Sequence, residues 1–262
     1  MLLAIDVGNT NCKFAVFDGE KMLDQWRIQT AHARTADEYA VWLTQLMALR
    51  GIQPRQIEGA IIATVVPQVL FNIRQLCVRY FSVEPLVVGE DNVDLGVQIL
   101  LDRPQDAGAD RVVNAIAAFK EFGGPLIIID FGSGTTFDVV DDHGNYCGGA
   151  IAPGIQLSIE AFYLMTARLP RIRVEKPSQV IGKATIPAMQ SGIFFGYIGL
   201  VEKLVGLIKA EYGKPMKVIA TGGLAPLFEK ETPVIEAVTA DLTMRGLQII
   251  YARNSQSAPR PR

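Results

Sequence analysis

Two stretches of the sequence combine a carboxylate with a turn that could bind phosphate. The first, LLAIDVGNTNCKFAVFDG, starts at residue 2, and the second, LIIIDFGSGTTFDVVDDHG, starts at residue 126. In each, an apolar run ends on Asp-x-Gly, passes through small polar residues and becomes apolar again. The glycine lets backbone N–H groups approach phosphate oxygens, while Asp6 or Asp130 could hold a cation or its water ligands. The pattern predicts two polyphosphate-binding turns.

The two stretches have almost the same length. Asp6 and Gly19 are 13 positions apart and Asp130 and Gly144 are 14 apart, with Gly134 as the extra residue of the second turn. Each reads as a strand, a turn and a returning strand, which indicates a hairpin and an internal duplication. We expect the two turns to face each other across a cleft and to hold a nucleoside triphosphate from both sides.

A third glycine-rich turn, VIATGGLAPLF, carries Gly222 and Gly223 and suits close approach by a nucleoside or a phosphate. A single Asp-x-Gly after a strand is more often only a turn, because Asp and Gly are good turn formers. Three such turns, two of them duplicated, favour a binding role. The sequence contains neither a G-x-x-x-x-G-K-[ST] loop nor a G-x-G-x-x-G turn followed by a helix, so P-loop and Rossmann sites are not supported.

The tetrapeptide GADR, residues 108–111, places a carboxylate, Asp110, and a guanidinium, Arg111, at the predicted start of a helix. Arg111 could form a two-pronged pair with a carboxylate or a phosphate. An ordinary aspartate, with a pKa near ~3.9, is a weak base for an alcohol, so Asp110 would orient a hydroxyl and accept its proton late. Its place at the helix start should keep it ionised. Taken alone, GADR could equally be a helix start with a surface ion pair.

The elements around these residues alternate between strand and helix. Thr35 and Glu38 have capping-box spacing before a helix that should end at Gly51, and GAIIATVV reads as a buried strand. The rhythm predicts an α/β protein whose sheets are partly parallel. We place one domain at 1–115, a second at 116–253, and a disordered polar tail at 254–262.

Composition excludes several classes of function. The 262 residues are 49% hydrophobic and 20% charged with a net charge of −2, so binding to nucleic acid is not expected. The start lacks a basic leader, and no later stretch approaches the roughly 20 apolar residues of a membrane span. Three widely spaced cysteines argue against disulfides and zinc. We expect a cytoplasmic protein without a membrane partner.

Five motifs resemble those of type III pantothenate kinases, within the superfamily of acetate kinase, sugar kinases, Hsp70 and actin. They occur in family order and span nearly the whole chain. They are DVGNT at 6–10, GADR at 108–111, DFGSGTTFD at 130–138, GGAIAPG at 148–154 and AMQSGIFFGY at 188–197. The resemblance implies two duplicated actin-like (ribonuclease H-like) domains, with mixed sheets flanked by helices.

The resemblance also implies an activity: ATP-dependent phosphorylation of pantothenate to 4'-phosphopantothenate, the first step of coenzyme A biosynthesis. It implies ATP, Mg²⁺ and a monovalent cation, K⁺ or NH₄⁺, and a homodimer with the substrate pocket at its interface. In this reading Asp110 is the catalytic proton acceptor, Asp6 helps to place Mg²⁺ and Asp130 binds the monovalent cation. The ATP-binding set is Asp6, Val7, Gly8, Asn9, Thr10, Asn11, Cys12, Lys13, Ser133, Gly222 and Gly223. The pantothenate-binding set is Gly108, Ala109, Asp110, Arg111 and Thr185.

Two departures from the family pattern bear on these roles. The chain has GSGTT where the family commonly has GTATT, so Ser133 keeps a hydroxyl in place of threonine. Ala184 stands before Thr185 where the family usually has asparagine, which removes one amide side chain from the substrate contact.

Two other functions remain open from the sequence: a non-catalytic nucleotide-binding regulator of transcription, and a kinase of another small alcohol. Among single residues, Asp138 could share cation binding or serve only as a structural hydrogen-bond acceptor. His32 and His143 are expected to be exposed and unrelated to chemistry. The aromatic cluster at 194, 195 and 197 is expected in the core or at a dimer interface.

Overall fold

The computed structural model describes residues 1–257, which form two compact units. The first unit contains Met1–Lys120 together with the helix that begins at Leu242, and the second is Glu121–Asp241. The predicted domains differ from these units, because residues 242–253 were assigned to the second domain and instead belong to the first. The predicted tail is also too long: residues 254–257 continue the last helix, and 258–262 lie outside the described residues.

The first unit is a five-stranded mixed sheet with helices on both faces. Its strand order is β3-β2-β1-β4-β5, with β1–β2 and β2–β3 antiparallel and β1–β4 and β4–β5 parallel. Its strands are β1 (Leu2–Val7), β2 (Asn11–Asp18), β3 (Lys21–Gln29), β4 (Gly59–Thr64) and β5 (Leu86–Val87). Its helices are α1 (Ala36–Leu49), α2 (Pro67–Phe81), α3 (Ala109–Phe122) and α7 (Leu242–Ser257), with short 3₁₀ turns η1 (Pro54–Gln56) and η2 (Pro104–Asp106).

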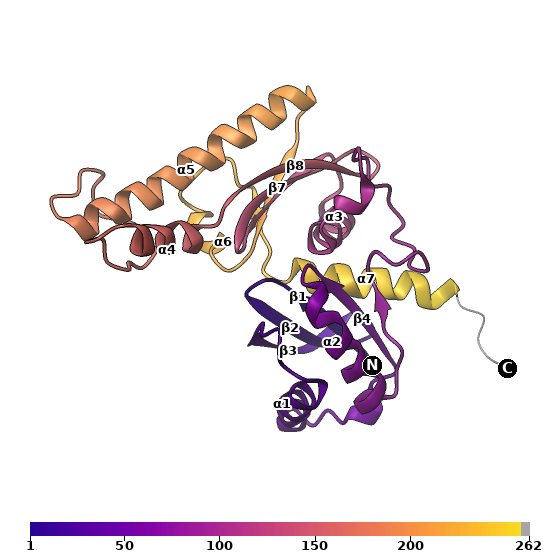
Figure 1. Ribbon diagram of the computed structural model, residues 1–262. Coiled ribbons are helices and arrows are strands. Elements are labelled where there is room, and N and C mark those ends of the chain that lie inside the picture. The colour runs from indigo at the N-terminus through magenta and orange to yellow at the C-terminus, as the bar shows by residue number, and fades with distance from the viewer. Residues whose placement is uncertain (258–262) are drawn as a thin grey trace. The chain divides into compact units, whose positions relative to one another are not determined.

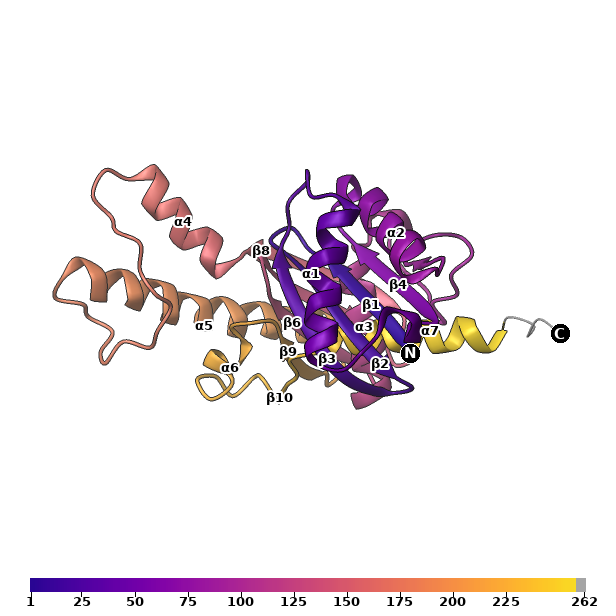
Figure 2. The ribbon, with the colours of Figure 1, turned by 90° about the horizontal axis from the view of Figure 1, so that it is seen from below.

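Side chains along β1 point alternately to the two faces of the sheet, and this alternation decides which helices each side chain contacts. Leu3, Ile5 and Val7 are fully buried in one apolar core with side chains of α1 and α2. Helices α1 and α2 therefore cover one face of this sheet, and α7 lies along the other (Figures 1 and 2). Because successive side chains point to opposite faces, Asp6 lies on the face away from α1 and α2.

The predicted capping box is confirmed at the start of α1. The Thr35 N–H donates to Glu38 Oε2 at 2.8 Å, and the Glu38 N–H donates to Thr35 Oγ1 at 3.3 Å. Gly51, just beyond the helix, has the left-handed φ of +72° that the sequence predicted. These local signals fix the helix that packs under the strand carrying Asp6.

The second unit repeats the same topology. Its order β10-β9-β6-β7-β8 is the first order read in reverse, with β6–β7 and β7–β8 antiparallel and β6–β9 and β9–β10 parallel. Its strands are β6 (Leu126–Phe131), β7 (Gly134–Val140), β8 (Tyr146–Pro153), β9 (Lys217–Thr221) and β10 (Ala237–Val238), and its helices are α4 (Ile155–Met165), α5 (Thr185–Tyr212) and α6 (Ala225–Phe228). The predicted duplication and the predicted fold class are both confirmed.

Helix α5 corrects one expectation about apolar stretches. It is 28 residues long, with a mean hydropathy of 1.5 over its most apolar 18-residue window, so by length and composition alone it could cross a membrane. A long core helix meets the same criteria. One face of α5 packs into the core of the second unit through Phe194, Val201 and Val205.

Candidate active site

The turn after β1 is held by hydrogen bonds to its own end and to the end of β3. The Gly8 N–H donates to the Asn11 carbonyl at 3.0 Å, and Thr30 Oγ1 donates to the Gly8 carbonyl at 2.7 Å. Asn9, Thr10 and Asn11 are exposed on this turn. A ligand can therefore reach the predicted phosphate-binding residues at the tip.

Two members of the predicted ATP set have side chains that face inward. Val7 and Cys12 are fully buried, and Cys12 Sγ lies 3.4 Å from Thr30 Oγ1 and 3.5 Å from Tyr39 Oη. Only the backbone of these two residues is placed to contact a ligand, and their side chains support the turn.

Asp6 and Lys13 form a cross-strand pair at the base of this turn. The β1–β2 register places them opposite each other, and Lys13 Nζ lies 3.7 Å from Asp6 Oδ2. Burial is the largest cause of a raised pKa at Asp6; Lys13 lowers this pKa, the neighbouring Asp110 raises it, and the net value is about 6. Two acids and one lysine are thus close enough to influence one another within the first unit.

Asp110 lies in the first turn of α3, as the sequence predicted. Its Oδ1 accepts a hydrogen bond from the Arg111 N–H at 2.8 Å. The expectation that the helix start keeps Asp110 ionised stays a prediction. Burial raises the pKa of Asp110 more than the Arg111 N–H, Arg111 itself and Lys13 lower it. A carboxylate with a raised pKa is a stronger base, which suits proton acceptance.

Gly108 has a packing reason to be glycine. A Cβ at this position would lie 2.8 Å from Asp110 Oδ1, so a larger residue would displace the carboxylate. The Gly108 carbonyl also accepts from the Arg111 and Val112 N–H groups at 3.1 and 3.2 Å. The GADR segment is therefore a helix start that holds Asp110 in one orientation.

A cavity of about 680 Å³ borders the GADR segment in the first unit. Its walls come from the end of β4, from α2, from the connection between β5 and η2, and from Ala107, Gly108 and Ala109. Most of its wall is apolar, including Leu70 and Val93. The sequence analysis missed this cavity; the available signal was a run of spaced apolar residues within an otherwise irregular segment before GADR.

The turn after β6 brings Asp130 and Gly222 together in the second unit. Asp130 pairs with Thr221 across β6–β9, and a Cβ at Gly222 would lie 2.6 Å from Asp130 Oδ1 and 2.7 Å from the Phe131 carbonyl oxygen. The φ of Gly222 is +92°, which also favours glycine. The third glycine-rich turn of the sequence is thus adjacent to the second acidic turn.

Ser133 is exposed at the tip of the Asp130 turn, where the Gly132 N–H donates to the Gly134 carbonyl at 3.1 Å. Gly154 lies against this tip, because a Cβ there would be 2.0 Å from the Ser133 carbonyl oxygen. Gly223 follows Gly222 and has open space beside it.

The structure favours the structural reading of Asp138. This residue is fully buried, with one oxygen accepting from Tyr146 Oη at 2.9 Å and the other from Thr136 Oγ1 at 2.8 Å. Residues 1–257 contain no group of three or more His, Cys, Asp or Glu side chains that could hold a metal ion. Any cation at these turns would need backbone, water or ligand oxygens in addition to an aspartate.

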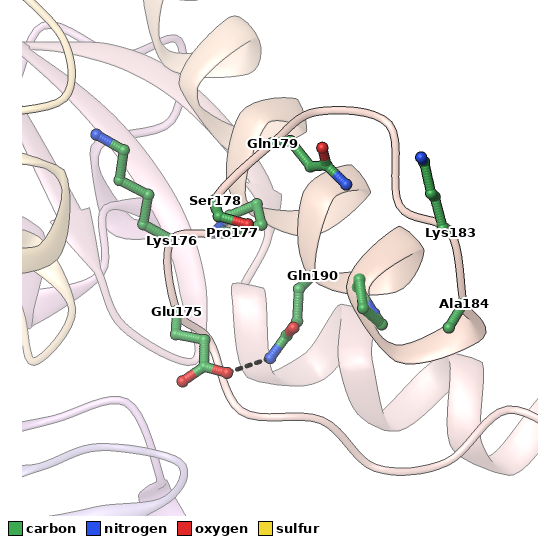
Figure 3. A pocket seen from close by; sticks show the side chains of 9 residues that line it. Glu175, Lys176, Pro177, Ser178, Gln179, Lys183, Ala184 and Gln190 are labelled. Atoms are coloured by element: carbon green, nitrogen blue, oxygen red, sulfur yellow. Dashed lines mark hydrogen bonds between the residues drawn. The ribbon is translucent and has the colours of Figure 1, made fainter.

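Thr185 is the exposed first residue of α5, with Ala184 as its N-cap. A smaller cavity of about 390 Å³ lies beside this helix start. Figure 3 shows the Gln190 side chain directed at Glu175, to which it donates at 2.5 Å. Thr185 belongs to the second unit and the GADR segment to the first, so the structure describes the two parts of the predicted substrate set separately.

The remaining expectations concern residues without a chemical role. His32 and His143 are exposed, and all three cysteines are free. Phe194 is fully buried, where its ring stacks on Phe228. Tyr197 Oη donates to the Pro153 carbonyl at 2.8 Å. The aromatic cluster is part of the core of the second unit.

Comparison with known proteins supplies the family. Residues 2–206 match the model of the type III pantothenate kinase family. The type III pantothenate kinase of Paramagnetospirillum magneticum is 61% identical over 97% of this chain and 98% of its own, and that of Rhodospirillum rubrum is 60% identical over 97% and 99%. One solved structure with a similar fold is that of a protein described as a putative Baf family transcriptional activator from Campylobacter jejuni. It superposes with a TM-score of 0.61 at 16% identity, over 97% of this chain and 99% of its own. At this identity the similarity supports the fold and not a function.

The match covers the Asp6 turn, the GADR segment, the Asp130 turn and the start of α5. This chain belongs to the type III pantothenate kinase family.

Proposed function

We propose that this protein phosphorylates pantothenate with ATP to give 4'-phosphopantothenate and ADP, as the first step of coenzyme A synthesis. The observation that carries the proposal is the group Asp6, Lys13 and Asp110, whose charges interact. Gly108 and Ala109, which come just before Asp110 in the chain, line a cavity of about 680 Å³. Family membership and the names of the relatives support the choice of reaction.

In the proposed reaction the terminal hydroxyl oxygen of pantothenate attacks the γ-phosphorus of ATP. A new O–P bond forms, the bond from the γ-phosphorus to the bridging oxygen breaks, and ADP leaves with that electron pair. The hydroxyl proton passes to Asp110. Phosphoryl transfer has a loose transition state, so the protein mainly positions the reactants and stabilises charge.

The Asp6 turn fits the phosphates of ATP on two grounds. Its exposed tip can present N–H groups to phosphate oxygens, and Lys13 supplies a positive charge at its base. Asp6 is a buried carboxylate with a pKa of about 6, and a nearby cation would favour its ionised form. Asp6 would hold Mg²⁺ or its waters; when bound, Mg²⁺ neutralises charge on the phosphates.

Asp130 fits a monovalent cation, K⁺ or NH₄⁺. The missing side chain of Gly222 leaves a space bordered by two oxygens, Asp130 Oδ1 and the Phe131 carbonyl. Oxygen atoms of this kind are the ligands that hard cations prefer. Ser133, exposed at the tip of the same turn, is the proposed contact to ATP.

Arg111 and the cavity beside GADR suit the acceptor substrate. Pantothenate carries a carboxylate, which an arginine can bind through two parallel hydrogen bonds. Its branched, apolar middle part matches walls that include Leu70 and Val93. Gly108 and Ala109 would contact the acceptor through their backbone.

We also propose that the protein acts as a homodimer in the cytoplasm. Large apolar side chains are exposed along α4 and around the start of α5, where a second copy would cover them; they are Leu157, Phe162, Tyr163, Leu164, Met165, Val180, Ile181 and Ile186. Thr185 lies among them and would reach the substrate pocket of that second copy. Three free cysteines fit a reducing compartment.

The experiment that tests the function is a coupled assay of ADP release by purified protein. We expect ADP only when ATP, Mg²⁺ and pantothenate are all present, loss of activity in EDTA, recovery with Mg²⁺ in excess, and stimulation by K⁺. A panel of small alcohols in place of pantothenate tests the alternative acceptor. ATP binding without ADP release in the complete mixture would contradict the proposal and favour a non-catalytic regulator.

A further inference from the structure

The connection between β5 and η2 forms one wall of the large cavity in the first unit. It covers residues 88–103 and contains turns, bends and one isolated bridge, but no helix or extended strand. Gly89, Glu90, Val93, Leu95 and Ile99 on this connection line the cavity. A segment without its own ladder of hydrogen bonds depends mainly on contacts with the rest of the fold to keep its shape.

One side chain of the last helix supplies such a contact. The Asp94 N–H donates to Asn254 Oδ1 at 2.9 Å, and Asn254 Nδ2 donates to the Asp94 carbonyl at 2.9 Å. A single amide thus satisfies both backbone groups of one residue, 160 positions earlier in the chain. The Asn254 amide pairs with Asp94 as a backbone residue of an adjacent β-strand would, and it fixes the position of the Asp94 backbone.

Arg253 adds contacts at the same place. One of its guanidinium nitrogens lies 3.5 Å from Asp94 Oδ2, while Asp94 Oδ1 accepts from the Gly96 N–H at 2.8 Å. A Cβ at Gly96 would lie 2.0 Å from the Arg253 guanidinium carbon, and Gly96 has a φ of +69°. The guanidinium therefore packs directly on the backbone of the connection.

Helix α7 is itself fixed to the sheet of the first unit. Ile250 is fully buried, and Tyr251 lies so close to β4 that a Cβ at Gly59 would be 1.8 Å from its hydroxyl oxygen. Asn254 Nδ2 also donates to the Ile250 carbonyl at 2.8 Å, which orients the amide. Asn254 is thus a rigid support rather than a surface residue that adapts to the connection.

A second anchor holds the connection near its start. Glu90 accepts from an Arg74 guanidinium nitrogen of α2 at 2.5 Å. The cavity wall is held at Glu90 by α2 and at Asp94 by α7. Val93, which faces the cavity, lies between the two anchors.

We propose that Asn254, assisted by Arg253, is a positioning residue for the acceptor substrate: it holds the Asp94 backbone and so the cavity wall at Val93 and Leu95. The proposal rests on the function above, in which pantothenate occupies this cavity. Asn254 lies beyond residues 2–206, the part matched by the family model. It acts on the acceptor side and not on the Asp6–Lys13 turn, so its loss should affect the two substrates differently.

The test compares Asn254→Ala with Ser255→Ala. Ser255 is the neighbouring position, and its hydroxyl donates to the Tyr251 carbonyl of its own helix. For Asn254→Ala we expect the KM for pantothenate to rise about tenfold, corresponding to roughly 1.4 kcal/mol. The KM for ATP and kcat should stay within about twofold, since the variant removes binding of one substrate and leaves the chemical step intact. Ser255→Ala should match the unmodified protein in every constant.

A second measurement is independent of catalysis. Hydrogen exchange of the peptide covering residues 91–102 should accelerate in Asn254→Ala and remain unchanged in Ser255→Ala, while exchange of α1 stays the same in both. If exchange at 91–102 is faster in Asn254→Ala but the unmodified protein does not phosphorylate pantothenate, the structural role of Asn254 stands and the proposed function is refuted. Unchanged exchange at 91–102, or KM values for ATP and pantothenate that rise together, would overturn the positioning role.

Discussion

Lys13 Nζ lies 3.7 Å from Asp6 Oδ2, and the same register position in the second hairpin pairs Thr136 with Asp130. The two units therefore differ in the residue that lies across from the acid on the next strand: lysine across from Asp6 and threonine across from Asp130. A lysine beside Asp6 favours phosphate binding, because it offsets the negative charge of the carboxylate. A threonine beside Asp130 leaves more room for a bound cation to provide the positive charge. This single difference fits the proposed division between an ATP turn and a monovalent-cation turn.

Asp6→Asn should stabilise the ligand-free protein at high pH. The folded pKa of Asp6 is about 6, above its ordinary value of 3.8, because burial penalises the charged form. The folded state thus binds the proton more tightly than the unfolded state, and the stability that the neutral acid provides is complete below about pH 4 and lost as pH rises to about 6. Denaturant unfolding should show a gain of about 1–3 kcal/mol for Asp6→Asn at pH 8 and almost none at pH 4.

The matched control for this effect is Asp18→Asn, at an exposed aspartate of the same unit. It should show no gain that depends on pH. Asp6→Asn should also lose activity, since an amide binds Mg²⁺ less well than a carboxylate. An Asp6→Asn protein that is destabilised equally at both pH values would contradict the raised pKa.

Asp110→Asn should lower kcat by about 10²–10⁴-fold without unfolding the protein, because it removes the proton acceptor and keeps the shape of the side chain. Burial raises the pKa of Asp110, so activity of the unmodified protein should fall as the acid becomes protonated on lowering the pH. Steady-state kinetics and thermal melting check both parts. The Asp18→Asn protein again serves as control, and equal kcat in Asp110→Asn and Asp18→Asn would refute the proton-acceptor role.

Gly222→Ala should impair the response to K⁺, whereas Gly223→Ala should not. The new methyl group at 222 would lie 2.6 Å from Asp130 Oδ1, at a φ of +92° that disfavours alanine. A Cβ at Gly223 would meet nothing within 4 Å. We expect Gly222→Ala to cost about 1–3 kcal/mol of stability and to raise the K⁺ concentration for half activation about tenfold. Titrations with K⁺ on both variants measure this, and the idea fails if the two curves coincide.

Short-range signals predicted much of this structure. The capping box at Thr35 and the left-handed Gly51 depend on residues a few positions apart, so the sequence could show them directly. The duplicated Asp-x-Gly hairpins likewise carry their strand and turn signals locally. The two acidic turns and the helix start at Asp110 were therefore placed correctly on their elements.

The features that the sequence analysis missed depend on contacts between distant positions. Helix α7 was not predicted at all, and it returns to the first unit because its apolar face, with Leu247 and Ile250, is buried there. Asn254, assigned to a disordered tail, pairs with a backbone segment far back in the chain. The direction of the pKa shift at Asp110 also depends on the fold, because burial is set by the whole unit whereas the helix start is set by neighbouring residues. The cavity beside GADR has walls from four separate segments, which no local pattern reports.

Leu164→Glu combined with Met165→Glu should convert the proposed dimer to a monomer. Leu164 is 67% and Met165 84% exposed at the end of α4, beside other exposed apolar side chains. Burying two new charges in an interface is unfavourable, whereas the same charges on a solvent-exposed surface cost little.

Sedimentation should give about 57 kDa, twice the 28.6 kDa chain, for the unmodified protein and about half of that for the variant. Leu49→Glu, at an 81% exposed position of α1, is the matched control and should remain dimeric. If Thr185 reaches the pocket of a second copy, the monomeric variant should also lose affinity for pantothenate, and a fully active monomer would rule out a shared pocket.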